Sequence, residues 1–208
     1  MKTGLMLSKS LNGPWHFASE DGVVVAESHD KHHWTYHSKT GTENPAMAKI
    51  GDTFYIFFKA GRAQNKTMHY GYATSKTIEG PYTMCNEPKM DNIHYIEDAT
   101  AFQQSGKTYL LTTDKFGKNT GIFGAGILWE MQNGRFKREN AKIGFGVLSD
   151  YLNLPKSTTF YENERSSKLE RPGILMKNGI PEYFYGCTRA DVNGSGKSQC
   201  YVFKIHKF

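Results

Sequence analysis

Residues 44–61, NPAMAKIGDTFYIFFKAG, indicate how this 208-residue chain folds. The turn Ile50-Gly51-Asp52 separates two runs that are rich in residues common in strands, so the stretch predicts a β-hairpin. A polar loop follows, and then two further strand-like segments, MHYGYATSK (68–76) and GPYTM (80–84). The region therefore predicts a unit of four short strands.

The same pattern occurs twice more along the chain. One copy starts at Asp98 with DATAFQQSGKTYLLTTD and continues with AGILWEM and NGRFKRE. The other starts at Arg171 with RPGILMKNGIPEYFYGCT and ends with SQCYVFKI. In the first two copies, three pairs of equivalent residues are each 54 residues apart: Asn44 and Asp98, Tyr55 and Tyr109, Gly80 and Gly134. A constant offset between equivalent turns is typical of tandem propeller blades and is not expected of a β-sandwich.

The N-terminal residues match the outer half of such a unit. GLMLSKSLNGPWHF (4–17) parallels HYGYATSKTIEGPYTM (69–84), which holds the predicted third and fourth strands, and no inner hairpin precedes it. We therefore predict an all-β propeller with about three and a half blades in a single domain, 1–208. Its predicted parts are the outer part of one blade (1–40), two blades (41–90 and 95–140) and a final blade (168–208). The inner strands of the first blade are expected upstream of this sequence or in a second copy of the chain, as a homo-oligomer.

Composition and charge narrow the classes of partner. Apolar residues make up 38% of the chain and aromatic residues 13%, which is typical of a folded domain rich in strands. The net charge is +6, but the lysines are scattered among acidic residues, so we expect no nucleic-acid partner. No apolar run reaches the roughly 20 residues of a membrane span, and we expect no membrane association. The first residues lack the apolar core of a signal peptide, which leaves the localisation open.

Cysteine and histidine supply few candidate sites. Three cysteines are too few for a disulfide framework. Cys187 and Cys200 fall on neighbouring predicted strands, where they either pair or, as we expect, remain free thiols. The histidines of HDKHH (29–33) are of a metal-ligand type, but this segment is predicted to be an edge turn that leads into Trp34. We expect neither a metal nor a cofactor.

Polar loops gather at one rim of the predicted blades. Because the first strand of a blade runs one way and the second runs back, the start of the first strand and the loop after the second share one rim. The residues placed there are Glu43, Asn44 and the loop 59–66, Glu97, Asp98 and the loop 114–124, and Glu170, Arg171 and the loop 188–197. These loops are long and polar, whereas the turns at the opposite end are short, so this rim is the predicted functional face.

Glu97 and Asp98 are the most informative residues on this rim. A carboxylate at the start of a crowded inner strand is costly to bury alone, so it has either an ion-pair partner or a chemical task. In one interpretation, Glu97 and Asp98 pair with Arg171 and Lys115 and hold neighbouring blades together. In the other, they belong to a catalytic or binding site. The sequence leaves both open.

Four segments resemble the five-bladed propeller glycoside hydrolases of family 43 and the related family 117: NPAMAKIGDTFYIFFKAG, HYGYATSKTIEGPYT, IEDATAFQQSGKTYLLTTD and ERPGILMKNGIPEYFYG. The resemblance covers nearly the whole chain and implies cleavage of glycosidic bonds in plant or algal polysaccharides. Family 43 enzymes invert the anomeric centre with a general base, a general acid and an aspartate that tunes the acid. The acid must be protonated near neutral pH, and the base must be ionised on the opposite face of the sugar. The resemblance also implies that a full-length relative is secreted or periplasmic.

Carried over by motif, the resemblance implies roles for particular residues. Glu97 is the expected general acid, Asp98 orients or tunes it, and Arg171 binds a sugar hydroxyl or keeps a carboxylate ionised. The expected substrate-binding residues are Glu43, Asn44, Lys59, His69, Asp114, Glu170 and Arg189. The expected partner is an oligosaccharide or polysaccharide.

Two departures from the family pattern bear on activity. Asn44 stands where relatives often carry the tuning aspartate, and the first blade has no inner strand to carry the general base. We therefore keep two hypotheses: a glycosidase in its full-length form, and a carbohydrate-binding propeller without turnover. A propeller that binds proteins would be expected to have apolar rim loops, and these loops are polar.

Overall fold

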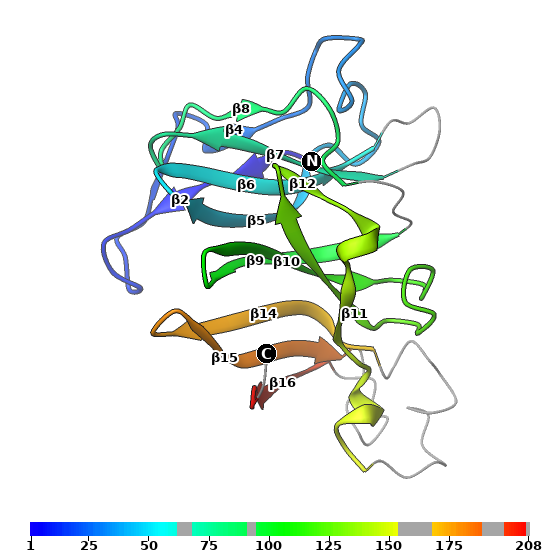
Figure 1. Ribbon diagram of the computed structural model, residues 1–208. Coiled ribbons are helices and arrows are strands. Elements are labelled where there is room, and N and C mark those ends of the chain that lie inside the picture. Colours follow the sequence, from blue (N-terminus) through cyan, green and yellow to red (C-terminus); the bar gives the residue numbers. More distant parts are fainter. Residues whose placement is uncertain (62–67, 91–94, 154–167, 189–197, 207–208) are drawn as a thin grey trace. The chain divides into compact units, whose positions relative to one another are not determined.

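The computed structural model describes residues 1–61, 68–90, 95–153, 168–188 and 198–206. The chain divides into two compact units, Met1–Asp91 and Asn92–Phe208, and each is described by itself. The described residues form strands and two short 3-10 helices (Figure 1), which confirms the predicted all-β class. No helix among them is long and apolar enough to cross a membrane. The single domain expected over residues 1–208 stays a prediction.

The first unit is built around a four-stranded antiparallel sheet in the order β5-β6-β7-β8. Its strands are β5 (Glu43–Ile50), β6 (Thr53–Ala60), β7 (His69–Ser75) and β8 (Thr83–Met84). Ile50 pairs with Thr53 around Gly51, whose φ of 56° lies in the left-handed region that glycine adopts readily. The hairpin predicted from residues 44–61 and the two strands after it are therefore confirmed.

Two short ladders precede this sheet. They are formed by β1 (Thr3–Gly4) with β4 (Val23–Val25), and by β2 (Met6–Leu7) with β3 (His16–Phe17). Met6 faces Phe17 as Ala73 faces Met84 in the β7–β8 ladder, so equivalent pairs lie 67 residues apart. The sequence similarity between residues 4–17 and 69–84 thus corresponds to two antiparallel hairpins with equivalent pairing. The β1–β4 ladder was not predicted.

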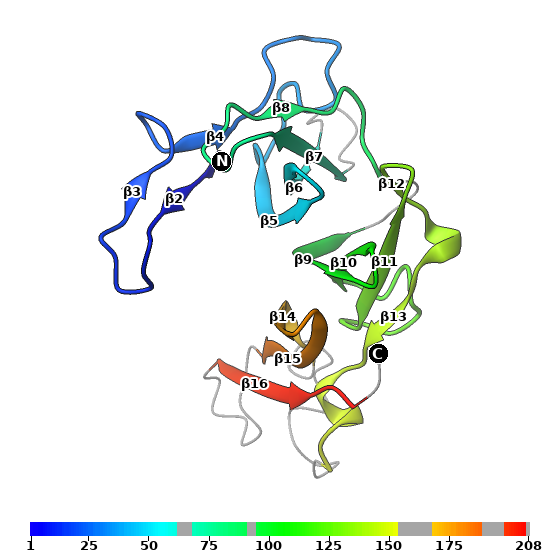
Figure 2. The same ribbon diagram turned by 60° about the vertical axis from the view of Figure 1, so that its left-hand side comes forward.

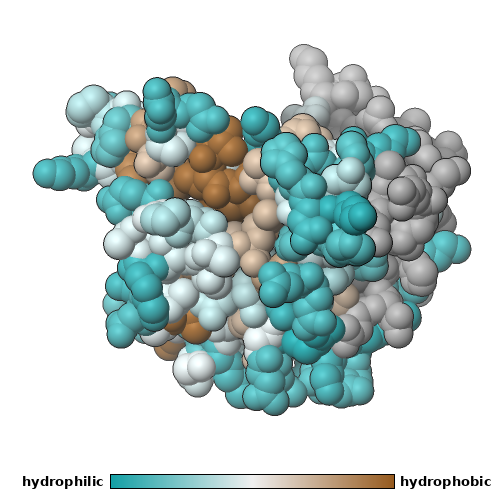
Figure 3. Space-filling model, turned by 90° about the horizontal axis from the view of Figure 1, so that it is seen from above, coloured by the Kyte–Doolittle hydropathy of each residue, from teal (hydrophilic) through white to brown (hydrophobic). Residues whose placement is uncertain are grey.

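The β2–β3 hairpin differs from its β7–β8 counterpart in what covers it. Trp15 and Phe17 are exposed, whereas Tyr82 and Met84 pack against the core of the unit. The reason is that β6 lies beside β7, while β2 pairs only with β3 among the described strands. On the face drawn in Figure 3, hydrophobic side chains gather in one region and hydrophilic ones cover most of the rest. The β2–β3 hairpin is therefore the less covered of the two, and the outer part of a blade expected over residues 1–40 stays a prediction.

The histidine-rich segment 29–33 leads into the core of the first unit. Trp34 stacks on Phe58, with ring centroids 5.3 Å apart, and its Nε1 donates a hydrogen bond of 2.8 Å to the carbonyl of Cys85. His33 lies with Nε2 3.1 Å from the same carbonyl oxygen, so it contributes to packing. Within the described part of the chain, no group of three or more His, Cys, Asp or Glu side chains is placed to hold a metal ion.

Among its described residues, the second unit contains two sheets, whose strands Figure 2 draws in colours from green to red. One has the order β9 (Ile96–Gln104), β10 (Lys107–Asp114), β11 (Gly126–Gln132) and β12 (Arg135–Phe136). The other has the order β14 (Glu170–Lys177), β15 (Ile180–Thr188) and β16 (Gln199–Lys204). The first strands of the two sheets, β9 and β14, contact each other. Phe145 and Phe184 stack with centroids 4.7 Å apart in the core between the sheets.

The segment after β12 departs from the prediction. It forms the 3-10 helix η1 (Arg138–Asn140), strand β13 (Lys142–Phe145) and the 3-10 helix η2 (Leu148–Asp150). Strand β13 returns to pair with β11, with Gly126 opposite Phe145. A Cβ atom at Gly126 would lie 1.9 Å from the Phe145 ring, so the pairing depends on glycine there. The sequence prediction treated this segment as a connection and missed the strand.

Candidate functional site

Three dipeptides occupy the same place in three sheets. Glu43-Asn44, Glu97-Asp98 and Glu170-Arg171, called here the strand-start pairs, lie at the beginning of β5, β9 and β14. The second residue of each pair has a left-handed backbone, with φ of 50°, 54° and 54° in turn. The strand ladder is irregular beside each pair. Such bulges redirect side chains, and left-handed non-glycine residues are uncommon and concentrated at functional positions.

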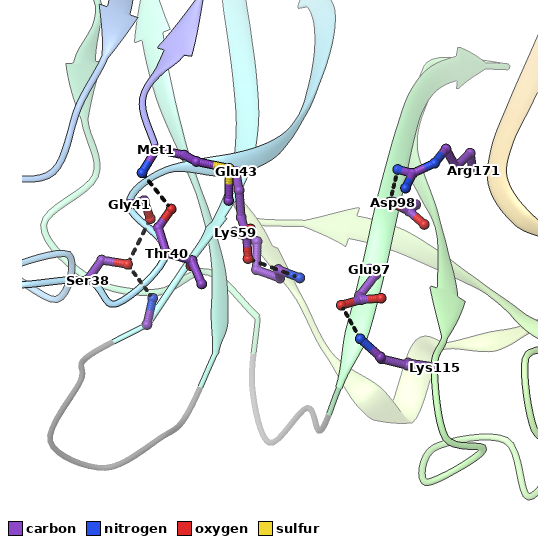
Figure 4. Close-up of polar contacts among 11 residues, drawn as sticks. Met1, Ser38, Thr40, Gly41, Glu43, Lys59, Glu97, Asp98, Lys115 and Arg171 are labelled. Atoms are coloured by element: carbon purple, nitrogen blue, oxygen red, sulfur yellow. Dashed lines mark hydrogen bonds and ion pairs between the residues drawn. The ribbon is translucent and has the colours of Figure 1, made fainter.

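Glu97 forms an ion pair within its own sheet. Lys115, which directly follows β10, places Nζ 2.9 Å from Oε1 of Glu97 (Figure 4). The Glu97 side chain is 25% exposed, so it remains within reach of a ligand. The backbone N–H of Lys115 also donates to the carbonyl of Tyr95, which holds Lys115 beside the strand start.

Asp98 forms the second ion pair, and this pair links two sheets. Arg171 Nη1 lies 3.0 Å from Asp98 Oδ1 (Figure 4). The Asp98 side chain is only 9% exposed and the Arg171 side chain 71%, so the guanidinium covers a nearly buried carboxylate and keeps its outer side open. Both ion pairs of the first interpretation are therefore present. Only the Asp98–Arg171 pair joins neighbouring sheets, because Glu97 and Lys115 belong to the same one.

Glu170 is equivalent to Glu97 in the next sheet. It forms an ion pair with Lys168, whose side chain is largely buried and lies with Nζ 5.9 Å from the centre of the Phe123 ring. Lys168 is a residue that the sequence prediction missed. Its signal in the sequence is weak, since a lysine two residues before a strand carries no motif. Glu97 and Glu170 each precede a left-handed residue near a strand start and each pair with a lysine, so the structure gives Glu170 a more prominent place than the sequence did.

Asp114 is buried at the end of β10 and organises the loop that follows. Its carboxylate oxygens accept hydrogen bonds from the backbone N–H groups of Lys118, Asn119 and Thr120, at 2.7–3.1 Å. They also accept bonds from the side chains of Asn119 and Thr120. Any effect of Asp114 on a substrate would therefore act through this loop, and its predicted substrate contact stays a prediction.

In the first unit, Glu43 and Lys59 face each other across β5 and β6, with Nζ 3.3 Å from Oε1 (Figure 4). His69 opens β7 opposite Ala60, one residue from Lys59. Four predicted substrate-binding residues, Glu43, Asn44, Lys59 and His69, are thus brought together at one end of a single sheet. Arg189 lies outside the described residues.

The ion pairs limit the chemistry that this arrangement performs. A nearby ammonium group stabilises an ionised carboxylate. A general acid instead has to carry a proton before it can donate one. With Lys115 in contact, Glu97 is therefore suited to accept hydrogen bonds from sugar hydroxyls. Proton donation requires that the Lys115 contact be loosened.

Comparison with known proteins gives the fold. No protein-family profile matches the sequence, and no curated protein matches it significantly. A family 43 β-xylosidase/α-arabinofuranosidase from a compost microbial metagenome matches with a TM-score of 0.59 and 14% identity, over 99% of this chain and 63% of its own. An α-L-arabinanase of Cellvibrio cellulosa gives a TM-score of 0.52 and 14% identity, over 98% and 70%. A xylan β-1,4-xylosidase of Bacillus halodurans C-125 gives 0.53 and 18%, over 90% and 32%.

These similarities confirm the predicted fold class and, at the level of the fold, the resemblance to propeller glycoside hydrolases. The chain has the all-β fold of the β-propeller glycosidase type. It spans 63% of the compost enzyme's chain and 32% of the B. halodurans enzyme's chain. Structural similarity at 14–18% sequence identity establishes the fold, and it does not assign roles to individual residues.

Proposed function

We propose that this chain is a glycoside hydrolase-like protein that acts on an oligosaccharide or polysaccharide of plant or algal origin. The observation that supports it is the repeated strand-start pair: near the start of the first strand of three sheets, a glutamate is followed by a left-handed polar or charged residue. The chain also shares its fold with a xylosidase, an arabinofuranosidase and an arabinanase. The proposed reaction is inverting acid/base hydrolysis.

In this proposal, Glu97 donates a proton to the leaving glycosidic oxygen. Asp98 orients or tunes Glu97, and Arg171 holds Asp98 ionised or binds a sugar hydroxyl. Hydroxyls of a sugar bound beside Glu97 would compete with Glu97 for Lys115, and loosening of that contact favours the protonated carboxyl that the reaction needs. The general base is not assigned to a residue of this chain.

The remaining predicted residues are proposed to contact the substrate. These are Glu43, Asn44, Lys59, His69, Glu170 and Arg189, and Asp114 is proposed to contact the substrate through the loop that its carboxylate holds. Carboxylate, amide and ammonium groups are suited to sugars, whose hydroxyls both donate and accept hydrogen bonds.

A second candidate function, carbohydrate binding without turnover, is favoured by a specific observation. Glu43, Glu97 and Glu170 are each ion-paired with a lysine, which suits hydrogen-bond acceptance better than proton donation. Asn44 also stands in the place of a tuning carboxylate.

One experiment separates the two functions. The full chain is mixed with xylan-derived, arabinan-derived and algal oligosaccharides, and both heat of binding and newly formed products are measured. Products formed above the buffer rate support hydrolysis. Binding without products supports the second function, and the absence of both contradicts the whole proposal.

A further inference from the structure

Two cysteines lie opposite each other on neighbouring strands of the last sheet, the central strand β15 and the edge strand β16. Cys187 on β15 is paired in register with Cys200 on β16, and their sulfur atoms are 2.8 Å apart. Both are free thiols. A disulfide bond is about 2.05 Å long, so a side-chain movement of less than about 1 Å would bring the sulfurs to bonding distance.

The third cysteine has a different environment. Cys85 Sγ contacts the carbonyl of Glu87 at 3.1 Å and accepts a hydrogen bond from the N–H of Tyr72 at 3.3 Å. Burial raises the pKa of the Cys85 thiol, which disfavours its reactive thiolate form. Cys200, by contrast, is exposed. Cys85 is therefore expected to react more slowly than Cys200, and it serves as a control within the same chain.

We propose that Cys187 and Cys200 form an oxidation site, at which a low-molecular-weight disulfide converts the two thiols into a cross-strand disulfide bond. The thiolate of exposed Cys200 attacks the reagent disulfide, forms a mixed disulfide and releases one small thiol. Cys187 then attacks the Cys200 sulfur, forms the protein disulfide and releases the second small thiol. The two protons of the cysteine thiols end on the two small thiols, the protein loses two electrons, and the reagent gains them.

The environment of Cys187 supports this order of events. Burial raises the pKa of the Cys187 thiol to about 11, and its hydrogen bond with the Cys200 sulfur adds to the shift. Glu170 raises this pKa further and Arg171 lowers it. Because Cys187 is mostly protonated at neutral pH, it acts as the second, resolving thiol, and the second step should accelerate as the pH rises.

Oxidation of the Cys187–Cys200 pair would affect the structure because of where the pair lies in its sheet. Among the described strands, β16 pairs only with β15, so it is the edge of its sheet. The disulfide would anchor the N-terminal end of β16. It would also lie beside the strand-start pair of this sheet, since Cys187 is opposite Glu170. Closing a short loop stabilises the folded chain mainly by restricting the unfolded one.

The test uses the full chain, reduced and then exposed to oxidised glutathione. The free thiols, counted after denaturation, should fall from three to one, and peptide mapping should join Cys187 to Cys200. The melting temperature should rise by about 5–10 °C relative to the reduced chain. Cys85→Ser should behave as the wild type, with both remaining thiols lost.

Two single variants resolve the order of the steps. Cys187→Ser should accumulate glutathione on Cys200, because the resolving thiol is absent. Cys200→Ser should keep its thiols free under the same conditions. A stable glutathione adduct on wild-type Cys200, a disulfide between two chains, or three remaining thiols would each overturn the proposal.

Discussion

Asp98 and Arg171 occupy the same place in two adjacent sheets, and each reaches the other across the boundary. Both have φ of 54° and directly follow the glutamate near the start of the first strand of their sheet, and Arg171 Nη1 lies 3.0 Å from Asp98 Oδ1. The repeated backbone geometry thus places a nearly buried carboxylate of one sheet against a cation of the next. This pair holds the sheets together and sits beside Glu97, the proposed acid.

The first prediction concerns this pair. Asp98→Asn and Arg171→Gln should each lower the free energy of unfolding, and a double-mutant cycle should give a coupling of about 1 kcal/mol, since Arg171 is largely exposed. Asparagine tolerates the left-handed backbone, so Asp98→Asn changes mainly the charge. Urea unfolding of the four proteins measures the coupling. Additive effects would mean that the pair contributes nothing to stability.

The second prediction concerns the buried carboxylate of Asp114. Asp114→Ala removes the acceptor of three backbone N–H groups and should lower the free energy of unfolding by about 2–4 kcal/mol. Cleavage in residues 115–124 by a protease should become faster. Asp52→Ala, in an exposed hairpin turn, is the control and should change stability by less than about 0.5 kcal/mol. Equal effects of the two variants would contradict the anchoring role.

The third prediction separates backbone strain from contact. Gly121 and Gly124 have φ of 80° and 78°, but a Cβ atom would meet nothing within 4 Å at Gly121 and would lie 2.0 Å from Lys168 Cβ at Gly124. Gly121→Ala should cost about 1 kcal/mol, and Gly124→Ala about 2 kcal/mol more. Thermal unfolding measures both. Similar losses would show that Lys168 moves aside without cost.

The fourth prediction is a pH dependence. A hydrogen bond from Lys107 holds the pKa of Glu130 below its ordinary value. A lowered folded-state pKa stabilises the protein above the unfolded pKa, about 4.3, and this contribution disappears as the pH falls through the folded value. The stability difference between wild type and Lys107→Met should therefore be present at pH 7 and vanish in strong acid. Lys9→Met should show no such pH-dependent difference.

Much of the fold follows from local sequence. The turns at Gly51, Gly106 and Gly179 all have left-handed glycine, and the constant spacing between equivalent turns predicts successive sheets correctly. These features depend only on neighbouring residues, which is why sequence predicts them. Strand β13 depends instead on the absence of a side chain at Gly126, where a Cβ atom would meet the Phe145 ring. Gly126 and Phe145 come together only in the folded chain, so local sequence does not predict this pairing.

The candidate site was predicted in position and only partly in detail. Glu97, Asp98 and Glu170 were placed at strand starts because the alternation of strands and turns locates them. The left-handed backbone and the Lys168–Glu170 pair were not predicted, since both depend on how bulges turn side chains in three dimensions. Which glutamate matters most likewise depends on the side chains that surround each one in the folded chain, and the sequence does not show these.

The most direct test of Glu97 as the general acid compares wild type with Glu97→Gln on two kinds of substrate. Natural oligosaccharides have poor leaving groups that need protonation, whereas dinitrophenyl glycosides leave without it. Glu97→Gln should lower kcat/KM by about 100- to 10,000-fold on the oligosaccharides and by less than about tenfold on the aryl glycosides. Glu139→Gln, on exposed η1, is the control and should leave both rates unchanged. Equal losses on both kinds of substrate, or the same background rate for wild type and Glu97→Gln, would contradict the assignment.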